Sequence, residues 1–216
     1  MNSTPSMRVR ATFSKTMAMR YTGHLDVQRA WERALRRGSI PLAYSQGFKP
    51  HPKLNIAAPL PLGFTGTNEL IDIWLDEHLP LNTLETKIAA ALPPGLLVSS
   101  LIEVAIFGPK LPSLLTGAAY TITLLTSVSN LDARVLTFLA QNTIIRERRK
   151  KSYDLRPLVK ALHLLPNNDQ DQQRLLVELN AAPGATGRPD EVLLALDLHP
   201  HNAQIERTAL LLKDAK

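Results

Sequence analysis

The sequence predicts an α+β protein built from two tandem ferredoxin-like (β-α-β-β-α-β) domains with antiparallel sheets. Three observations point to this fold class. Strand-type and helix-type hydrophobic patterns follow the order β-α-β-β-α-β over residues 1–106, a segment with two prolines and a glycine interrupts them at 107–116, and a similar order then recurs. We therefore expect an N-terminal domain at 1–110 and a C-terminal domain at 117–216.

The first domain should begin with a half-buried strand followed by an amphipathic helix. The strand, MRVRATF at 7–13, alternates, which places Arg8 and Arg10 on the face opposite its apolar residues. The helix, HLDVQRAWERALRR from residue 24, has one apolar stripe, and Gly38 suits the position after its last turn. The arginines on its outer side are Arg29, Arg33, Arg36 and Arg37.

Shorter patterns complete both domains. After a loop with glycine and prolines we expect strands at 54–60 and 69–75, a helix at 81–92 and a strand at 96–106. In the second domain we expect strands at 119–125, 143–148, 174–179 and 205–212, and helices at 131–141 and 189–198. We interpret DLRPLVKALHL, at 154–164, as an insertion that contains a short helix, with Pro157 near its first turn.

The composition is that of a basic protein without cysteine. The net charge is +6, and 44% of the residues are hydrophobic. The lack of cysteine excludes disulfides, thiolate zinc sites and cysteine-ligated iron–sulfur clusters within this chain. No apolar run is long enough for a membrane span, and the N-terminus MNSTPSMRVR lacks the apolar stretch of a secretory signal. We expect a cytoplasmic protein with no membrane partner.

Positive charge is concentrated in two parts of the chain. Residues 1–60 carry a net charge of +8 and residues 144–160 carry +5, so the remainder is net −7. Such a concentrated field favours a polyanionic partner, whereas a dispersed +6 would only keep the chain soluble. Phosphate contacts are therefore expected from the arginines of the first helix, although a solvated face with Glu32 paired to Arg36 explains them equally well.

The loop YSQGFKPHPK, at 44–53, is the most unusual segment. Gly47 permits a sharp turn, and Pro50 and Pro52 hold their neighbours extended, so less conformational entropy is lost on binding. The groups suited to nucleic acid are Tyr44 and Phe48 for stacking, Lys49 and Lys53 for phosphates, and Gln46 and His51 for hydrogen bonds. For the two aromatic residues, packing into the core is the competing interpretation.

A second basic segment, RERRKK, occupies 146–151. If Arg146 and Arg148 lie on a strand, their side chains point to the same face. Runs of this kind bind nucleic acid but also occur as solvated loops. The candidate contacts here are Arg146, Arg148, Arg149, Lys150, Lys151 and Arg156.

Catalysis has weaker signals. His24, Asp26 and His51 would supply a general base and an orienting carboxylate if they clustered, as a stand-alone RNA endonuclease or modifying enzyme requires. No Walker loop, dinucleotide fingerprint, GxSxG or HExxH occurs, and His199-Pro-His201 lacks an evident third ligand. We expect no metal and no cofactor.

The stretch HLDVQRAWERALRRGSIPLAYSQGFKPHPKLNIAAPLPLG, at 24–63, resembles the radical SAM-linked protein family, a domain of unknown function, and RERRKKSYDLRPLV resembles that family's later basic stretch. Lys49 departs from the family pattern, in which asparagine is commoner. The resemblance implies that the protein acts beside a separate radical SAM protein or a ribonuclease of the E/G type, because this chain cannot hold a radical SAM cluster itself.

We therefore expect a non-catalytic accessory protein that binds RNA and assists a partner RNA-modifying or processing enzyme. The RNA expected first is tRNA or rRNA. The hypothesis requires the first-helix arginines, the loop at 44–53 and the segment at 146–151 to share one face. The first alternative is the enzyme with His24, Asp26 and His51. The second is a protein-docking subunit without nucleic-acid contact, which would expose the apolar residues 111–115 or a sheet face.

Overall fold

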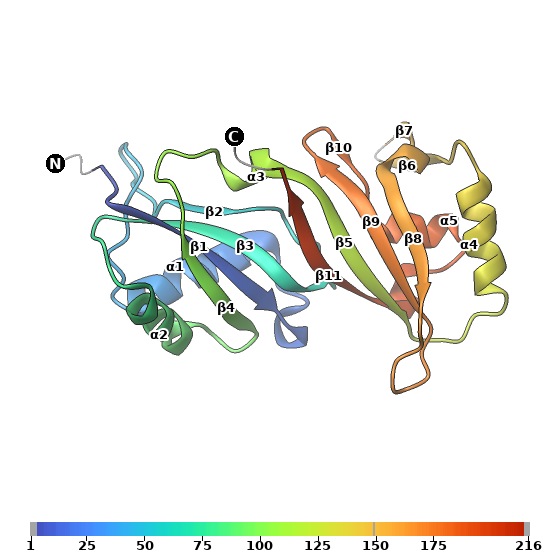
Figure 1. The fold of residues 1–216 in the computed structure, drawn as a ribbon, viewed down its shortest axis with the longest axis horizontal. Helices are drawn as coiled ribbons and strands as arrows, with labels where there is room; N and C mark the ends of the chain where they lie inside the picture. Colours follow the sequence, from blue (N-terminus) through green and yellow to red (C-terminus); the bar gives the residue numbers. More distant parts are fainter. Residues whose placement is uncertain (1–3, 149, 214–216) are drawn as a thin grey trace. The chain divides into compact units, whose positions relative to one another are not determined.

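The computed structural model describes residues 4–148 and 150–213, and these form two compact units. The described residues up to Leu115, together with Lys213, make up unit 1, and Thr116–Leu212 make up unit 2 (Figure 1). Each unit combines helices with a sheet whose reported strand pairings are antiparallel. The predicted α+β class is confirmed.

Unit 1 has the element order β-α-β-β-α-β. The elements are β1 (Met7–Lys15), α1 (His24–Arg37), β2 (Leu54–Ile56), β3 (Thr65–Leu75), α2 (Leu81–Ala91) and β4 (Leu96–Glu103), with the short helices η1 (Met17–Met19) and α3 (Leu111–Leu114). β1 pairs with both β3 and β4, and β2 pairs with β3, all antiparallel. The strand order β4-β1-β3-β2 is that of the split βαβ motif.

The core of unit 1 lies between the sheet and the two helices. Trp31 of α1 is fully buried and meets Phe13 of β1 edge-to-face, with ring centroids 5.1 Å apart. The predicted apolar stripe of α1 is confirmed, because Val27, Trp31 and Leu35 are all buried in this core. Buried residues of α2 join the same cluster, so both helices cover one face of the sheet.

Two details of unit 1 differ from the expectations. Gly38 has an ordinary negative φ of −74°, and the left-handed position falls to Ser39 instead. The chain approaches α2 closely at Gly38, since a Cβ there would lie 3.2 Å from the carbonyl oxygen of Lys87. The second detail is the burial of Arg8: it shares a face of β1 with Arg10, as expected, since both bind Asp72, but only 1% of it is exposed.

Unit 2 contains its own run of paired strands and a separate hairpin. Its elements are β5 (Leu115–Leu124), α4 (Leu131–Ala140), β6 (Ile145–Arg148), β7 (Lys151–Asp154), η2 (Arg156–Leu158), β8 (Val159–Leu165), β9 (Arg174–Ala182), β10 (Ala185–Thr186), α5 (Pro189–Ala195), η3 (Pro200–Asn202) and β11 (Ala203–Leu212). The sheet runs β10-β9-β5-β11, and β8 also pairs with β9. β6 and β7 pair only with each other in the described structure.

The interpretation of 154–164 as an insertion is wrong, although the short helix expected near Pro157 is present as a 3₁₀ turn. Only Arg156–Leu158 forms a 3₁₀ turn, and Val159–Leu165 is strand β8, paired antiparallel with β9. The basic strand predicted at 143–148 is β6, and it lies in the hairpin rather than in the main sheet. The inserted element between α4 and β8 is therefore the β6–β7 hairpin.

No helix in the described part of the chain is both long and apolar enough to cross a bilayer.

Candidate nucleic-acid interface

Residues 43–53 form a narrow projection, which we call the tongue. At its base the N–H of Lys53 donates to the carbonyl oxygen of Ala43 at 2.8 Å. Further out, the N–H of Ser45 donates to the carbonyl oxygen of His51, also at 2.8 Å. The Oγ of Ser45 accepts a return bond from the His51 N–H at 3.0 Å. Beyond this pair the chain turns through Gly47, whose φ of +122° lies in the region that favours glycine. The tongue is therefore a paired, proline-stiffened structure.

The tongue exposes the side chains that the sequence singled out. Phe48 is fully exposed at 102% of the reference area, and Tyr44 is 39% exposed. Gln46, Lys49 and His51 are exposed, and Lys53 is half-buried. The interpretation that the two aromatic residues pack into the core is therefore wrong. The tongue contains no acidic residue, so an aromatic ring stands at its tip among cations.

Trp74 of β3 joins the base of the tongue to a second loop. Its carbonyl oxygen accepts from the N–H of Ala43 at 2.9 Å, and its own N–H donates to Lys53 at 3.1 Å. Its indole N–H donates to the carbonyl oxygen of Ile106 at 3.2 Å. The loop 104–110 is thus tied to the same residue as the tongue, and it carries Phe107, which is 84% exposed (Figure 1).

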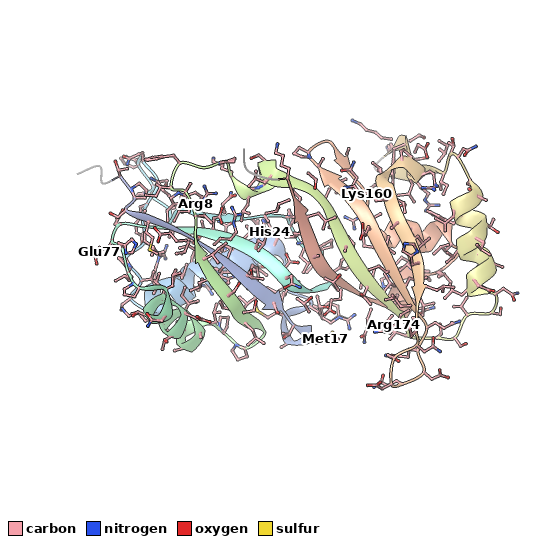
Figure 2. The ribbon with its side chains drawn as sticks, in the orientation of Figure 1. Arg8, Met17, His24, Glu77, Lys160 and Arg174 are labelled. Carbon is pink, nitrogen blue, oxygen red and sulfur yellow. The ribbon has the colours of Figure 1, made fainter. Side chains whose placement is uncertain are left out.

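Arg8 holds that second loop in place. Its guanidinium donates to three carbonyl oxygens of the loop, those of Ala105, Gly108 and Pro109, at 2.8–3.1 Å. The same guanidinium lies 4.6 Å from the ring centroid of Trp74 and pairs with the buried Asp72 through Nε at 3.2 Å (Figure 2). Sequence analysis missed Arg8 and Phe107, because the loop was interpreted as a linker. The signal available was a phenylalanine directly before Gly108 and Pro109, two residues typical of an exposed turn.

The outer arginines of α1 are exposed, but most have partners within the helix layer. Arg29 pairs with Asp26 at 3.2 Å, and Arg36 lies 3.9 Å from Glu32. Arg37 donates to the carbonyl oxygen of Ala91 at the end of α2. Arg33 is exposed as well. Exposed pairs of this kind are weak, so these arginines can exchange their partners for phosphate at little cost.

The second basic segment folds into the β6–β7 hairpin of unit 2. Arg148, Lys150 and Lys151 are exposed, and Arg149 lies outside the described residues. Arg146 is half-buried and pairs with Glu191 of α5 at 3.1 Å.

Arg156 has a structural role. Its guanidinium donates to the carbonyl oxygens of Gln141, Val159 and Leu139, so it holds the entry to β8. The hairpin and the tongue belong to different units, and a shared surface between them stays a prediction.

The catalytic cluster required by the enzyme alternative does not form. His24 lies at the start of α1 and lines a cavity of about 10 Å³ with Lys15 and Glu69, near the end of β1 (Figure 2). His51 lies in the tongue, which is anchored at the opposite end of β1. Because strands rise about 3.4 Å per residue, the two ends of this nine-residue strand are roughly 25 Å apart. Asp26 is exposed and pairs with Arg29.

No group of three or more His, Cys, Asp or Glu side chains in the described residues is arranged to hold a metal ion.

The apolar residues at 111–115 do not form the exposed patch expected for a docking subunit, because Leu111, Leu114 and Leu115 are buried. The docking alternative also named a sheet face, and that part stays a prediction.

The sequence matches one known protein family over most of its length. Residues 8–189 match the model of a family described as "Uncharacterized protein conserved in bacteria (DUF2344)". The chain belongs to this family. The matched range extends over both units and includes the residues of the tongue, of the loop 104–110 and of the β6–β7 hairpin. No curated protein matches the sequence.

Several solved structures are similar at low identity. A Cbf5–Nop10–Gar1 complex matches with a TM-score of 0.47 and 13% identity, covering 95% of this chain and 50% of that chain. An archaeal box H/ACA sRNP Nop10–Cbf5 complex matches with a TM-score of 0.46 and 14% identity, covering 95% and 49%. This chain thus spans about half the length of both. The acetolactate synthase small subunit from Thermotoga maritima matches with a TM-score of 0.26 and 8% identity, covering 95% of each chain.

Proposed function

We propose that this protein is an RNA-binding accessory protein, which uses the tongue to stack on bases and exposed cations to contact phosphates. The observation that carries the proposal is the full exposure of Phe48 at the tip of a paired, cationic projection. Burying a phenylalanine is worth about 1.5–3 kcal/mol, and a ring held wholly in water contributes none of that energy to the fold. Base stacking would recover that energy on binding.

The surroundings of Phe48 favour nucleic acid as the partner. Lys49 and His51 are exposed beside the ring, and the tongue has no carboxylate to oppose a phosphate. Phe107 offers a second exposed ring on the loop that shares Trp74 as an anchor. Aromatic rings interleaved with cations are the arrangement by which proteins bind single-stranded nucleic acid.

In unit 2, the phosphate contacts would come from the β6–β7 hairpin. Arg148, Lys150 and Lys151 are exposed there, whereas Arg146 and Arg156 are occupied by partners of their own. This division narrows the candidate contacts to the side chains near the turn. tRNA and rRNA are the proposed substrates, and the partner enzyme, a radical SAM protein or a ribonuclease of the E/G type, rests on the sequence resemblance alone.

The test is the affinity for total tRNA, measured by fluorescence anisotropy over a series of salt concentrations. Each phosphate contact adds roughly 0.7–0.9 to the slope of log K against log salt, so Arg148→Ala/Lys151→Ala should flatten the slope by about 1–2. The matched control Lys87→Ala/Lys213→Ala removes two exposed lysines outside both segments and should leave the slope unchanged.

Three results would contradict the proposal. Absence of tRNA binding at low salt would reject it outright. An equal loss of slope in the control would show that net charge, rather than the hairpin, governs binding. If the tongue instead inserts into a protein, a Phe48→Ala variant would bind tRNA like the wild type.

A further inference from the structure

Unit 2 contains a groove of about 550 Å³ between the β6–β7 hairpin and the turn that joins β9 to β10. The residues that line it are Arg148, Lys151, Tyr153, Asp154, Leu158, Gly184, Ala185, Thr186 and Arg188. A volume of this size is within the range of small-molecule sites. Sequence analysis did not find the groove, because Arg188 and Thr186 lie some 30–40 residues after the basic run.

Cations converge on the groove from both walls. On the hairpin, Arg148 and Lys151 are direct cross-strand partners, so their side chains leave the same face of the ribbon. Two like charges directly opposite each other destabilise a strand pair, and an anion between them would remove that repulsion. Tyr153 follows Lys151 by two residues and therefore points to the same face.

Arg188 comes from the other wall and is held in a fixed orientation. Its Nε and Nη2 bind both oxygens of Asp190, at 2.9 and 2.6 Å. The hydrogen bond to Asp190 raises the pKa of Arg188, so the guanidinium stays charged. Its side chain is 28% exposed, which leaves part of the group accessible from the groove.

The lone carboxylate among the lining residues, that of Asp154, is held by backbone donors. Oδ1 of Asp154 accepts hydrogen bonds from the N–H groups of Ile144 and Arg156, at 2.8 and 3.0 Å. Burial, followed by the nearby Glu191, raises the pKa of Tyr153, so its phenol remains a hydroxyl donor at neutral pH.

The groove also has apolar lining, from Leu158 and Ala185. Leu158 packs closely against the chain next to Arg188, because a Cβ added at Gly187 would come within 3.2 Å of both its Cβ and its carbonyl oxygen. Gly184 also lines the groove, and nothing lies within 4 Å of the place where its Cβ would be. Apolar lining beside cations and hydroxyls suits a flat ring joined to a phosphate.

The geometry points to a binding site for a nucleotide phosphomonoester in this groove, with the phosphate between Arg148, Lys151 and Arg188. A phosphomonoester carries nearly two negative charges at neutral pH, twice that of a backbone phosphodiester, and so matches three cations better. Two sources share this chemistry, a free mononucleotide and the phosphorylated end of an RNA strand. The second source rests on the proposed function.

The experiment compares one short oligoribonucleotide with a 5′-phosphate, with a 3′-phosphate and with hydroxyls at both ends, alongside free AMP. The wild-type protein should bind the oligoribonucleotide with a phosphorylated end roughly tenfold more tightly than the one with hydroxyls at both ends. If the ligand is a free mononucleotide, the protein should instead bind AMP roughly tenfold more tightly than adenosine. A factor of this size is the value of one charge-assisted contact. Lys151→Gln should remove most of that preference. Lys160→Gln is the matched control, because Lys160 is an exposed lysine of unit 2 outside the groove, labelled in Figure 2.

The outcomes separate this inference from the proposed function. If Lys151→Gln weakens all oligoribonucleotides equally, whatever their ends, the hairpin contacts the backbone and the inference is overturned while RNA binding stands. If AMP binds and no RNA does, the groove is confirmed and the RNA proposal fails. Thermal melting checks the fold, and Lys151→Gln should melt no lower than the wild type, since it removes a like-charge pair.

Discussion

Phe48→Ala should weaken RNA binding without changing the stability of the fold. The side chain is fully exposed, so it makes almost no packing contribution and its loss should change the free energy of unfolding by less than about 0.5 kcal/mol. A base stacked on an aromatic side chain is worth about 1–3 kcal/mol, which corresponds to an increase in Kd of roughly 5- to 150-fold. The salt dependence should be unchanged, because no charge is removed.

The assay is fluorescence anisotropy with a single-stranded oligoribonucleotide, accompanied by urea unfolding of each variant. Phe48→Trp should preserve affinity, because it keeps an aromatic face, whereas Phe48→Leu should behave more like alanine. Tyr21→Ala is the matched control, since Tyr21 is 73% exposed and follows β1 at the end away from the tongue. An unchanged Kd for Phe48→Ala, or an equal loss for Tyr21→Ala, would refute the stacking role.

Three further predictions concern stability. Asp72→Asn should lower the free energy of unfolding by about 3–5 kcal/mol in urea titrations, because the buried Arg8 loses its counter-charge. Trp31→Ala should cost about 3–5 kcal/mol by the same measurement, whereas Leu25→Ala, 64% exposed on the same helix, should cost less than about 0.5. The pKa of Tyr153 is raised from 10.0, so its contribution to the free energy of unfolding is present below pH 10 and is lost as the pH rises through the folded-state pKa. Tyr153→Phe should therefore lose less stability than the wild type in urea titrations at alkaline pH. An identical dependence of stability on pH in the two proteins would contradict this.

Elements with a strong local period were predictable from the sequence. In α1 the buried Val27, Trp31 and Leu35 recur every four residues, and the observed helix runs from His24 to Arg37. In β9 the alternation of Leu175, Val177 and Leu179 likewise matches its buried positions. These patterns depend only on which side of an element meets the core, so no knowledge of distant partners is needed.

β8 was missed because its pattern is ambiguous. The segment VKALHLL follows Pro157 and places apolar residues at spacings compatible with either a helix or a strand. Pairing with β9 decides the matter, and that pairing is set by tertiary structure rather than by local preference.

The buried state of Arg8 could not be predicted either. Alternation shows which residues share a face of a sheet, but it does not show what covers that face. The cover is the loop 104–110, about 100 residues further along the chain. In the same way, the composition of the tongue predicted stiffness, while the outward position of Phe48 depends on backbone bonds to Trp74.

The guanidinium of Arg8 connects strand β3, through Asp72, to the surface loop 104–110. The same group donates hydrogen bonds to Asp72 and to carbonyl oxygens of the loop 104–110. The ion pair with Asp72 and the conformation of that loop therefore cannot change independently. Exchange of the Phe107 loop with another sequence would therefore succeed only if the replacement also presented carbonyl oxygens to the same cation.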